Sequence, residues 1–195
     1  MLAKNHIPTG LASGVFVYSG LHWYQSNILP DYVDNDGFID NIAHYPINTL
    51  IDNMLINKWV GLVLGVILVI FGSLLPDIDN EKSTLGRYFR LPLRHRGLTN
   101  SLWAILLLGA VSLFVPLVGW VFVGYLTHVL LDGLSTAGWV PFYPLGKYKV
   151  INRGGVNMVV SDRYSGIYRV GYGMEYVLAV IWVVMMIGLS WWLFY

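Results

Sequence analysis

Histidine and acidic residues recur beside the long apolar segments of this 195-residue chain. Ionisable side chains in or next to a membrane-spanning segment are costly, so each one is a candidate for function. Here they come from short motifs far apart in the sequence: LLPDID, LRHRG, THVLLD, MEY and one N-terminal histidine. The candidate metal ligands are His6, Asp77, Asp79, His95, His128, Asp132 and Glu175.

The spacing of these residues favours metal binding. His128 and Asp132 are four residues apart, so on a helix their side chains share one face and can bind the same ion. Asp77 and Asp79 follow Pro76 and are two residues apart, so on an extended or turning segment both can point to one centre. Imidazole and carboxylate ligands suit zinc first, with manganese or iron as alternatives. The chain has no cysteine, which excludes thiolate sites and disulfides.

Five apolar segments must position these residues, and a bilayer requires about 20 residues of helix for each crossing. One segment runs over residues 8–24, one over 59–75, two share the uncharged run 97–131, and the last covers 176–195. Pro116 and Gly119 predict a tight turn that divides the run 97–131 into a helical hairpin. Only 12% of the residues are charged, against about 25% in soluble domains. We therefore predict an all-α integral membrane protein, with about five transmembrane helices in a single domain over residues 1–195.

The basic residues predict the orientation, because Lys and Arg are retained on the cytoplasmic side. Of the 12 basic residues, all but Lys58 lie near the N-terminus or in the loops after the second and fourth segments. We therefore expect a cytoplasmic N-terminus and an extracytoplasmic acidic loop at 27–57. Its string DYVDNDG loosely resembles a calcium loop but lacks the bidentate Glu that such a loop needs. All seven candidate ligands then fall at the cytoplasmic face. The net charge of +1 offers no basic face for nucleic acid.

Each candidate also has a simpler interpretation. His128 alone can form a hydrogen bond between helices, and Pro-Asp-Ile-Asp can be a helix end followed by a turn. His95 has an arginine on each side and can belong to a basic patch that binds anionic lipid. Glu175 can pair with a nearby arginine, and His6 can be free, as terminal histidines often are. The joint placement of the set at one membrane face favours the metal site.

The strings LLPDIDN, HRGLTNS and GYLTHVLLDGLSTAGWVPFYPL resemble the LexA-regulated inner-membrane family of metal-dependent hydrolases. The resemblance covers about residues 74–175, and the N-terminal histidine matches as well. A weaker similarity, in the order of the acidic and histidine residues, links the chain to zinc-dependent phospholipase C and P1-type nucleases. Those enzymes are all-helical and hydrolyse phosphoesters at a zinc cluster, so they bear on the fold alone.

The family motifs fall on particular residues of this chain. The Asp-Ile-Asp motif falls on Asp77 and Asp79, and the His-x-x-x-Asp motif falls on His128 and Asp132. The His-Arg-Gly motif begins at His95. The family pattern has a second histidine where this chain has an asparagine, at position 100.

Residues and resemblance together predict a membrane-bound, metal-dependent hydrolase that acts on a lipid phosphoester at the cytoplasmic face of a bacterial-type inner membrane. Asp79 or Glu175 is the expected general base, and Arg96 is expected to neutralise phosphate charge through bidentate contacts. Other predicted substrate contacts are Thr99, Asn100, Ser101 and Arg169. Two alternatives remain: a non-enzymatic protein whose polar cluster lines an ion or proton pathway, and a structural lipid-binding protein with a bound metal.

Overall fold

The computed structural model describes residues 3–27, 58–89, 91–162, 166–167 and 173–194. The predicted acidic loop at 27–57 lies outside the described residues, apart from Asn27. Arg169, predicted to contact substrate, lies outside them as well.

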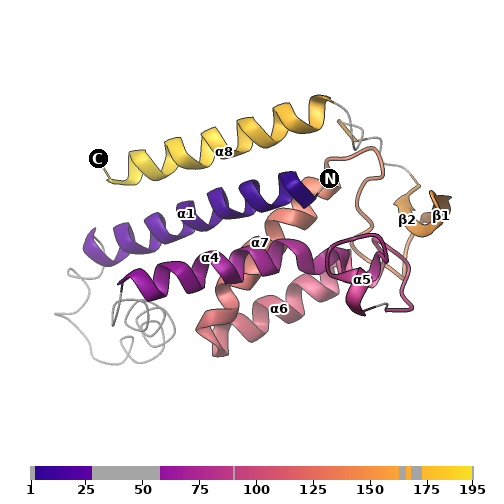
Figure 1. Ribbon diagram of the computed structural model, residues 1–195, viewed down its shortest axis with the longest axis horizontal. Helices are drawn as coiled ribbons and strands as arrows, with labels where there is room; N and C mark the ends of the chain where they lie inside the picture. The colour runs from indigo at the N-terminus through magenta and orange to yellow at the C-terminus, as the bar shows by residue number, and fades with distance from the viewer. Residues whose placement is uncertain (1–2, 28–57, 90, 163–165, 168–172, 195) are drawn as a thin grey trace.

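Each of the five apolar segments contains a helix in the described part of the chain (Figure 1). The long helices are α1 (Ala3–Asn27), α4 (Lys58–Leu74), α6 (Leu102–Phe114), α7 (Pro116–Gly133) and α8 (Gly173–Phe194). Only Val115 separates α6 from α7, and Pro116 then occupies the start of α7, where its missing N–H breaks no helical hydrogen bond. The predicted helical hairpin is thus confirmed.

One helix among the described residues is both long and apolar enough to cross a membrane, namely Gly173–Trp192 within α8, with a mean hydropathy of 1.9. Within the same described ranges, Leu102–Phe114 and Leu117–Gly133 are apolar but shorter. The helices are therefore confirmed, whereas five membrane crossings are not. The number of crossings and the side of the N-terminus stay predictions.

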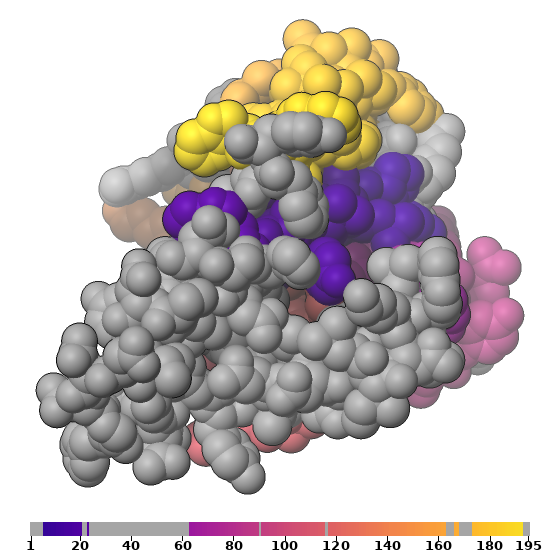
Figure 2. Space-filling view, turned by 90° about the vertical axis from the view of Figure 1, so that its left-hand side faces the viewer, coloured from indigo at the N-terminus to yellow at the C-terminus, as the bar shows by residue number. Residues whose placement is uncertain are grey.

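Close packing of α4 on α7 aligns the ends of these two helices. A Cβ atom at Gly72 would lie 2.0 Å from the carbonyl oxygen of Val121, and one at Gly124 would lie 2.2 Å from the carbonyl oxygen of Val69. Both positions therefore require glycine. Helix α1 packs against α4, α7 and α8, and Figures 1 and 2 show α8 along its outer side. The start of α1, the end of α4, the end of α7 and the start of α8 lie at one end of the molecule (Figure 1).

Short turns continue from these helix ends. The 3₁₀ helix η1 (Leu75–Asp79) directly extends α4, and α5 (Gly86–Phe89) and η2 (Leu98–Asn100) follow it along the chain. The carbonyl oxygen of Asp77 in η1 accepts hydrogen bonds from Asn80 N at 2.9 Å and from Ser83 Oγ at 2.6 Å. The segment that carries Asp77 and Asp79 is therefore anchored by its own loop.

The chain is not all-α, because residues 148–161 form an antiparallel hairpin of β1 (Tyr148–Arg153) and β2 (Val156–Ser161). The turn residues Gly154 and Gly155 both have positive φ, at 60° and 86°, as the commonest two-residue hairpin turn requires. The backbone of His95 joins β2: its N donates to Asn157 O at 3.0 Å, and its O accepts from Val159 N at 2.7 Å. The hairpin thereby fixes the segment that carries His95.

Candidate metal centre

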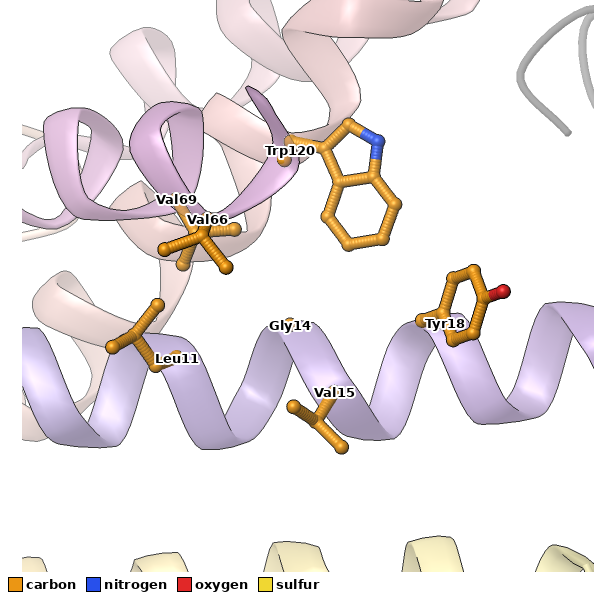
Figure 3. A pocket seen from close by; sticks show the side chains of 8 residues that line it. Leu11, Gly14, Val15, Tyr18, Val66, Val69 and Trp120 are labelled. Atoms are coloured by element: carbon orange, nitrogen blue, oxygen red, sulfur yellow. The ribbon is translucent and has the colours of Figure 1, made fainter. Parts of the chain in front are cut away.

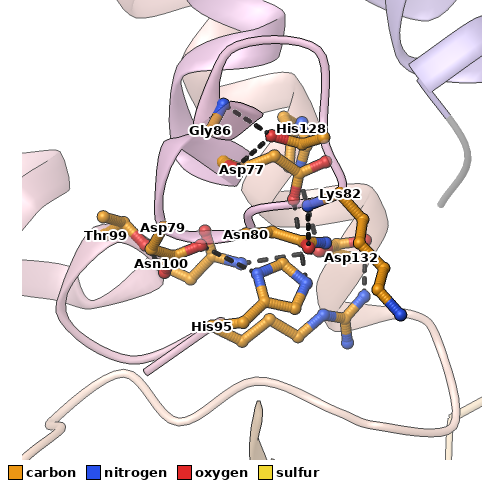
Figure 4. Close-up of polar contacts among 12 residues, drawn as sticks. Asp77, Asp79, Asn80, Lys82, Gly86, His95, Thr99, Asn100, His128 and Asp132 are labelled. Atoms are coloured by element: carbon orange, nitrogen blue, oxygen red, sulfur yellow. Dashed lines mark hydrogen bonds and ion pairs between the residues drawn. The ribbon is translucent and has the colours of Figure 1, made fainter. Parts of the chain in front are cut away.

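The histidine and aspartate side chains meet at the end of the molecule where α1 begins and where α4 and α7 end. His6 near the start of α1, Asp77 in η1 and His128 in α7 offer ligand atoms that all lie within 4.8 Å of one another. Asp132, one turn after His128, extends this cluster, with Oδ1 3.8 Å from His6 Nε2 and Oδ2 3.6 Å from His128 Nε2. We refer to these four residues as the candidate metal centre; Figure 4 shows three of them, Asp77, His128 and Asp132.

The distances between these atoms suit ligands of a shared ion better than direct hydrogen bonds. His128 Nε2 lies 3.5 Å from Asp77 Oδ1 and 3.6 Å from Asp132 Oδ2, which is longer than a hydrogen bond. Zinc binds nitrogen and oxygen ligands at about 2.0–2.2 Å, which places neighbouring tetrahedral ligands roughly 3.3–3.6 Å apart. Both distances from His128 are close to that separation.

The two buried imidazoles have ring nitrogen atoms that are open for a ligand. His128 Nδ1 lies 2.6 Å from the carbonyl oxygen of Ser73; a carbonyl only accepts, so Nδ1 carries the proton and Nε2 presents its lone pair. Among the described residues, His128 Nε2 and both ring nitrogens of His6 are buried without a hydrogen-bond partner. The rings stack with their centroids 3.6 Å apart. An unpaired buried polar atom costs about 1–3 kcal/mol, and one bound cation would satisfy His128 Nε2 and one ring nitrogen of His6.

Beside the centre, Asp79 and His95 form an oriented pair (Figure 4). His95 Nδ1 donates to Asp79 Oδ1 at 2.8 Å, while Thr99 Oγ1 donates to Asp79 Oδ2. The other ring nitrogen of His95, Nε2, lies 3.9 Å from Asp77 Oδ1. Both oxygens of Asp79 are already engaged. The geometry therefore favours a role for Asp79 in orienting His95 rather than in binding the metal directly.

Asp132 is held by partners on its other side. Arg96 Nη2 lies 2.6 Å from Asp132 Oδ1, and Arg96 Nη1 donates to Ser135 Oγ at 2.8 Å. Arg96 has a φ of 61°, a conformation that residues other than glycine adopt rarely. Asn100 Nδ2 lies 3.4 Å from Asp132 Oδ2, and its Oδ1 has no hydrogen-bond partner among the described residues. The structure thus places Arg96 as the partner of Asp132.

The charges of this network suit a divalent cation. Its carboxylates are Asp77, Asp79 and Asp132, and its one guanidinium is that of Arg96, so two negative charges remain when the histidines are neutral. Burial by itself would raise the pKa of Asp77, but the adjacent His128, in its protonated form, outweighs burial and holds the pKa of Asp77 below its usual value. A bound cation would take the place of this positive charge and leave His128 neutral, as a metal ligand must be.

The remaining predicted site residues are placed as follows. Thr99 holds Asp79, and Ser101 caps the start of α6, where its Oγ accepts from Ala104 N at 3.4 Å. Glu175 is fully buried in the first turn of α8 but is not one of the three residues that cluster most closely in the described part of the chain. Arg169 lies outside the described residues. The predicted contacts of these residues with a substrate stay predictions.

Three supporting groups were not predicted from the sequence. They are the carbonyl of Ser73, the hydroxyl of Ser135 and the phenol of Tyr125, which donates to the carbonyl oxygen of Thr99. Ser73 lies four residues before Asp77, and Tyr125 lies three residues before His128. Helical spacing from His128 would have identified Tyr125, whereas no side-chain pattern identifies the backbone carbonyl of Ser73.

Comparison with known proteins identifies a membrane family. The sequence profile of the YdjM inner membrane protein family matches residues 1–195. Inner membrane protein YdjM of Escherichia coli (strain K12) is 38% identical over 103 residues, which cover 44% of this chain and 50% of that protein. The same protein of Shigella flexneri matches to the same extent. The chain thus spans about half the length of these curated relatives, and no solved structure matches it. The family match confirms the resemblance seen in the motifs, and the names of the family and its relatives confirm the predicted location in the inner membrane.

Proposed function

We propose that this chain, which belongs to the YdjM inner membrane protein family, is a metal-dependent hydrolase of a lipid phosphoester at the cytoplasmic face of the membrane. The observation that carries the proposal is the buried cluster of His6, Asp77 and His128, whose open imidazole nitrogens lie close to the Asp77 carboxylate. The two imidazoles and the carboxylate of His6, Asp77 and His128 suit zinc and leave one position open for a water molecule, with manganese or iron as alternatives.

A divalent metal supplies a water molecule with a pKa near 7 and an electrophile for the phosphoryl oxygen. The chain itself supplies a proton acceptor: the Asp79 carboxylate fixes the proton on His95 Nδ1, so His95 Nε2 accepts the proton of the attacking water. The water oxygen bonds to phosphorus as the ester P–O bond breaks, and the proton passes to the departing alkoxide. The His95 side chain is 12% exposed, against 1% for His6 and His128, which suits contact with a substrate.

Other residues contribute through position and charge. Arg96 pairs with Asp132 and orients it, and the unpaired Oδ1 of Asn100 is available to accept a hydrogen bond from a water molecule. Glu175, buried at the start of α8, is the second candidate for the general base.

An ion or proton pathway is the alternative function. It requires polar groups that continue along the helices beyond the metal centre. The space between α1, α4 and α7 is instead a cavity with a mainly aliphatic lining. Among the described residues, this lining contains no carboxylate, imidazole or amine, which favours a hydrolase over a pathway for ions.

Replacement of Asp77 by asparagine tests the proposal. We expect the variant to hydrolyse a lipid phosphoester at least about 10–100-fold more slowly, because loss of an outer-shell partner alone costs that much and Asp77 is a direct ligand. The full chain, reconstituted in vesicles with added zinc or manganese, is assayed against a series of lipid phosphoesters, and the released phosphate compound is quantified.

Asp162→Asn is the matched control, because Asp162 lies on the hairpin and pairs with the exposed Lys149 at 2.9 Å. Its rate is expected to equal that of the unmodified chain. Turnover in Asp77→Asn equal to that of Asp162→Asn would contradict the proposal. The same holds if the metal-loaded chain hydrolyses no member of the series.

A further inference from the structure

An apolar cavity of about 170 Å³ lies between α1, α4 and α7. Figure 3 shows side chains of the three helices around it. The lining includes Leu11, Gly14, Tyr18, Val66, Val69 and Trp120. The polar side-chain atoms of its whole lining are the Tyr18 hydroxyl and the indole nitrogen of Trp120. An empty cavity of about 150 Å³ with such a lining stays dry and accepts an apolar molecule of the size of benzene. The cavity is therefore suited to a hydrocarbon ligand.

The packing of α1 on α4 limits one side of this cavity. A Cβ atom at Gly14 would lie 3.1 Å from Cγ2 of Val69 and 3.9 Å from Cζ3 of Trp120. The glycine thus lets α1 approach α4 closely at this level. Val66, by contrast, is 40% exposed, so the cavity is open beside this residue to the surroundings of the helices. In an inner membrane protein, those surroundings include lipid chains.

The cavity and the candidate metal centre lie along the same three helices. On α1, Leu11 follows His6 by five residues; on α4 and its extension, Val69 precedes Asp77 by eight. Trp120 precedes His128 on α7 by eight residues. At a helical rise of 1.5 Å per residue, these separations place the cavity about 8–12 Å from the metal centre along the helix axes.

We propose that this cavity binds one acyl chain of the lipid whose phosphoester lies at the metal centre. The proposal rests on the proposed function and specifies its substrate class: a lipid with a long acyl chain rather than a water-soluble phosphoester. Its basis is the combination of an aliphatic lining, an opening beside an exposed valine and a place directly along the helices from the metal ligands. Of the molecules that a membrane offers, an acyl chain matches all three.

Photocrosslinking tests this assignment without relying on turnover. The full chain is reconstituted in phosphatidylethanolamine and phosphatidylglycerol vesicles that contain a small share of phosphatidic acid with a diazirine on its acyl chain. After irradiation, labelled residues are mapped by mass spectrometry. We expect labels concentrated on residues 11–18 and 66–69, above the level on exposed α8 residues such as Val180.

Val66→Phe is designed to fill the cavity, and Ile67→Phe is its matched control. Ile67 is the next residue on α4, is 55% exposed and is not part of the cavity lining. We expect Val66→Phe to reduce labelling of residues 11–18 about tenfold, the loss expected when about two methylene groups are excluded from an apolar site. Ile67→Phe should leave that labelling unchanged, and both variants should retain the metal content of the unmodified chain.

The outcomes separate this proposal from the proposed function. Labels spread evenly over the cavity residues and α8, with no effect of Val66→Phe, would mean that the labels come only from contact with bulk lipid. This result would overturn the acyl-chain site. Equal hydrolysis of short-chain and long-chain phosphoesters would overturn it too. Specific cavity labelling in a chain that binds metal but hydrolyses no phosphoester would support the lipid site and overturn the hydrolase.

Discussion

Replacement of His128 by alanine is expected to lower the affinity of the chain for zinc by about 100-fold or more. Structural zinc sites bind with apparent energies of about 10–16 kcal/mol, which is roughly 3 kcal/mol for each of four ligands. His128 lies centrally in the cluster, with Nε2 3.5 Å from Asp77 and 3.6 Å from Asp132. Its loss also leaves the buried carbonyl of Ser73 without the hydrogen bond from Nδ1. Metal content of the purified variant, measured by elemental mass spectrometry, checks this expectation.

Thr127→Ala is the matched control for His128→Ala. Thr127 is the preceding residue on α7 and is also buried, but its hydroxyl donates to Val123 O at 2.8 Å within the same helix. Thr127→Ala should retain the zinc of the unmodified chain. Equal zinc in the two variants would exclude His128 from the ligands.

Replacement of Arg96 by leucine is expected to produce the largest loss of stability. The guanidinium of Arg96 lies 2.6 Å from Asp132 Oδ1, and both side chains are buried. Removing one partner of a buried ion pair costs about 3–5 kcal/mol, because the other charge stays buried without compensation. At roughly 2–4 °C for each kcal/mol in a chain of this size, the midpoint of thermal unfolding should fall by about 10 °C. A thermal unfolding assay in detergent with a chelator present measures this fall.

Zinc should restore part of the stability that Arg96→Leu loses. A cation beside Asp132 compensates the buried negative charge that the missing guanidinium leaves unpaired. Arg94→Leu is the control, because Arg94 is two residues away and exposed, so its midpoint should change little. An Arg96→Leu variant as stable as Arg94→Leu would mean that the Arg96–Asp132 pair contributes nothing measurable to the fold.

Apolar runs were sufficient to predict the long helices, because a continuous hydrophobic stretch specifies a helix locally. The break between α6 and α7 was predictable for the same reason: Pro116 acts within its own turn. Placing candidate ligands at one end of the helices also followed from sequence, since His6, Asp77 and His128 each stand near the corresponding helix end.

Local sequence patterns did not predict which role each candidate side chain has in the site. Asp79 and Asp77 were equivalent candidates in the sequence, yet Asp79 uses both oxygens on His95 and Thr99 while Asp77 faces His128. That distinction depends on the direction of each side chain in η1. The hairpin was missed for a different reason. Its lysine and arginine belong to the predicted basic loop, although the paired glycines at 154–155 between two segments with β-branched residues are typical of a hairpin turn.

X-ray absorption spectroscopy of the zinc-loaded, unmodified chain tests most directly whether these helix ends bind one ion. From the proposed function we expect one zinc per chain with nitrogen and oxygen neighbours at about 2.0–2.2 Å, and the multiple scattering of two imidazoles from His6 and His128. A purified chain that takes up no zinc, or zinc whose spectrum lacks imidazole scattering, would contradict a shared metal centre.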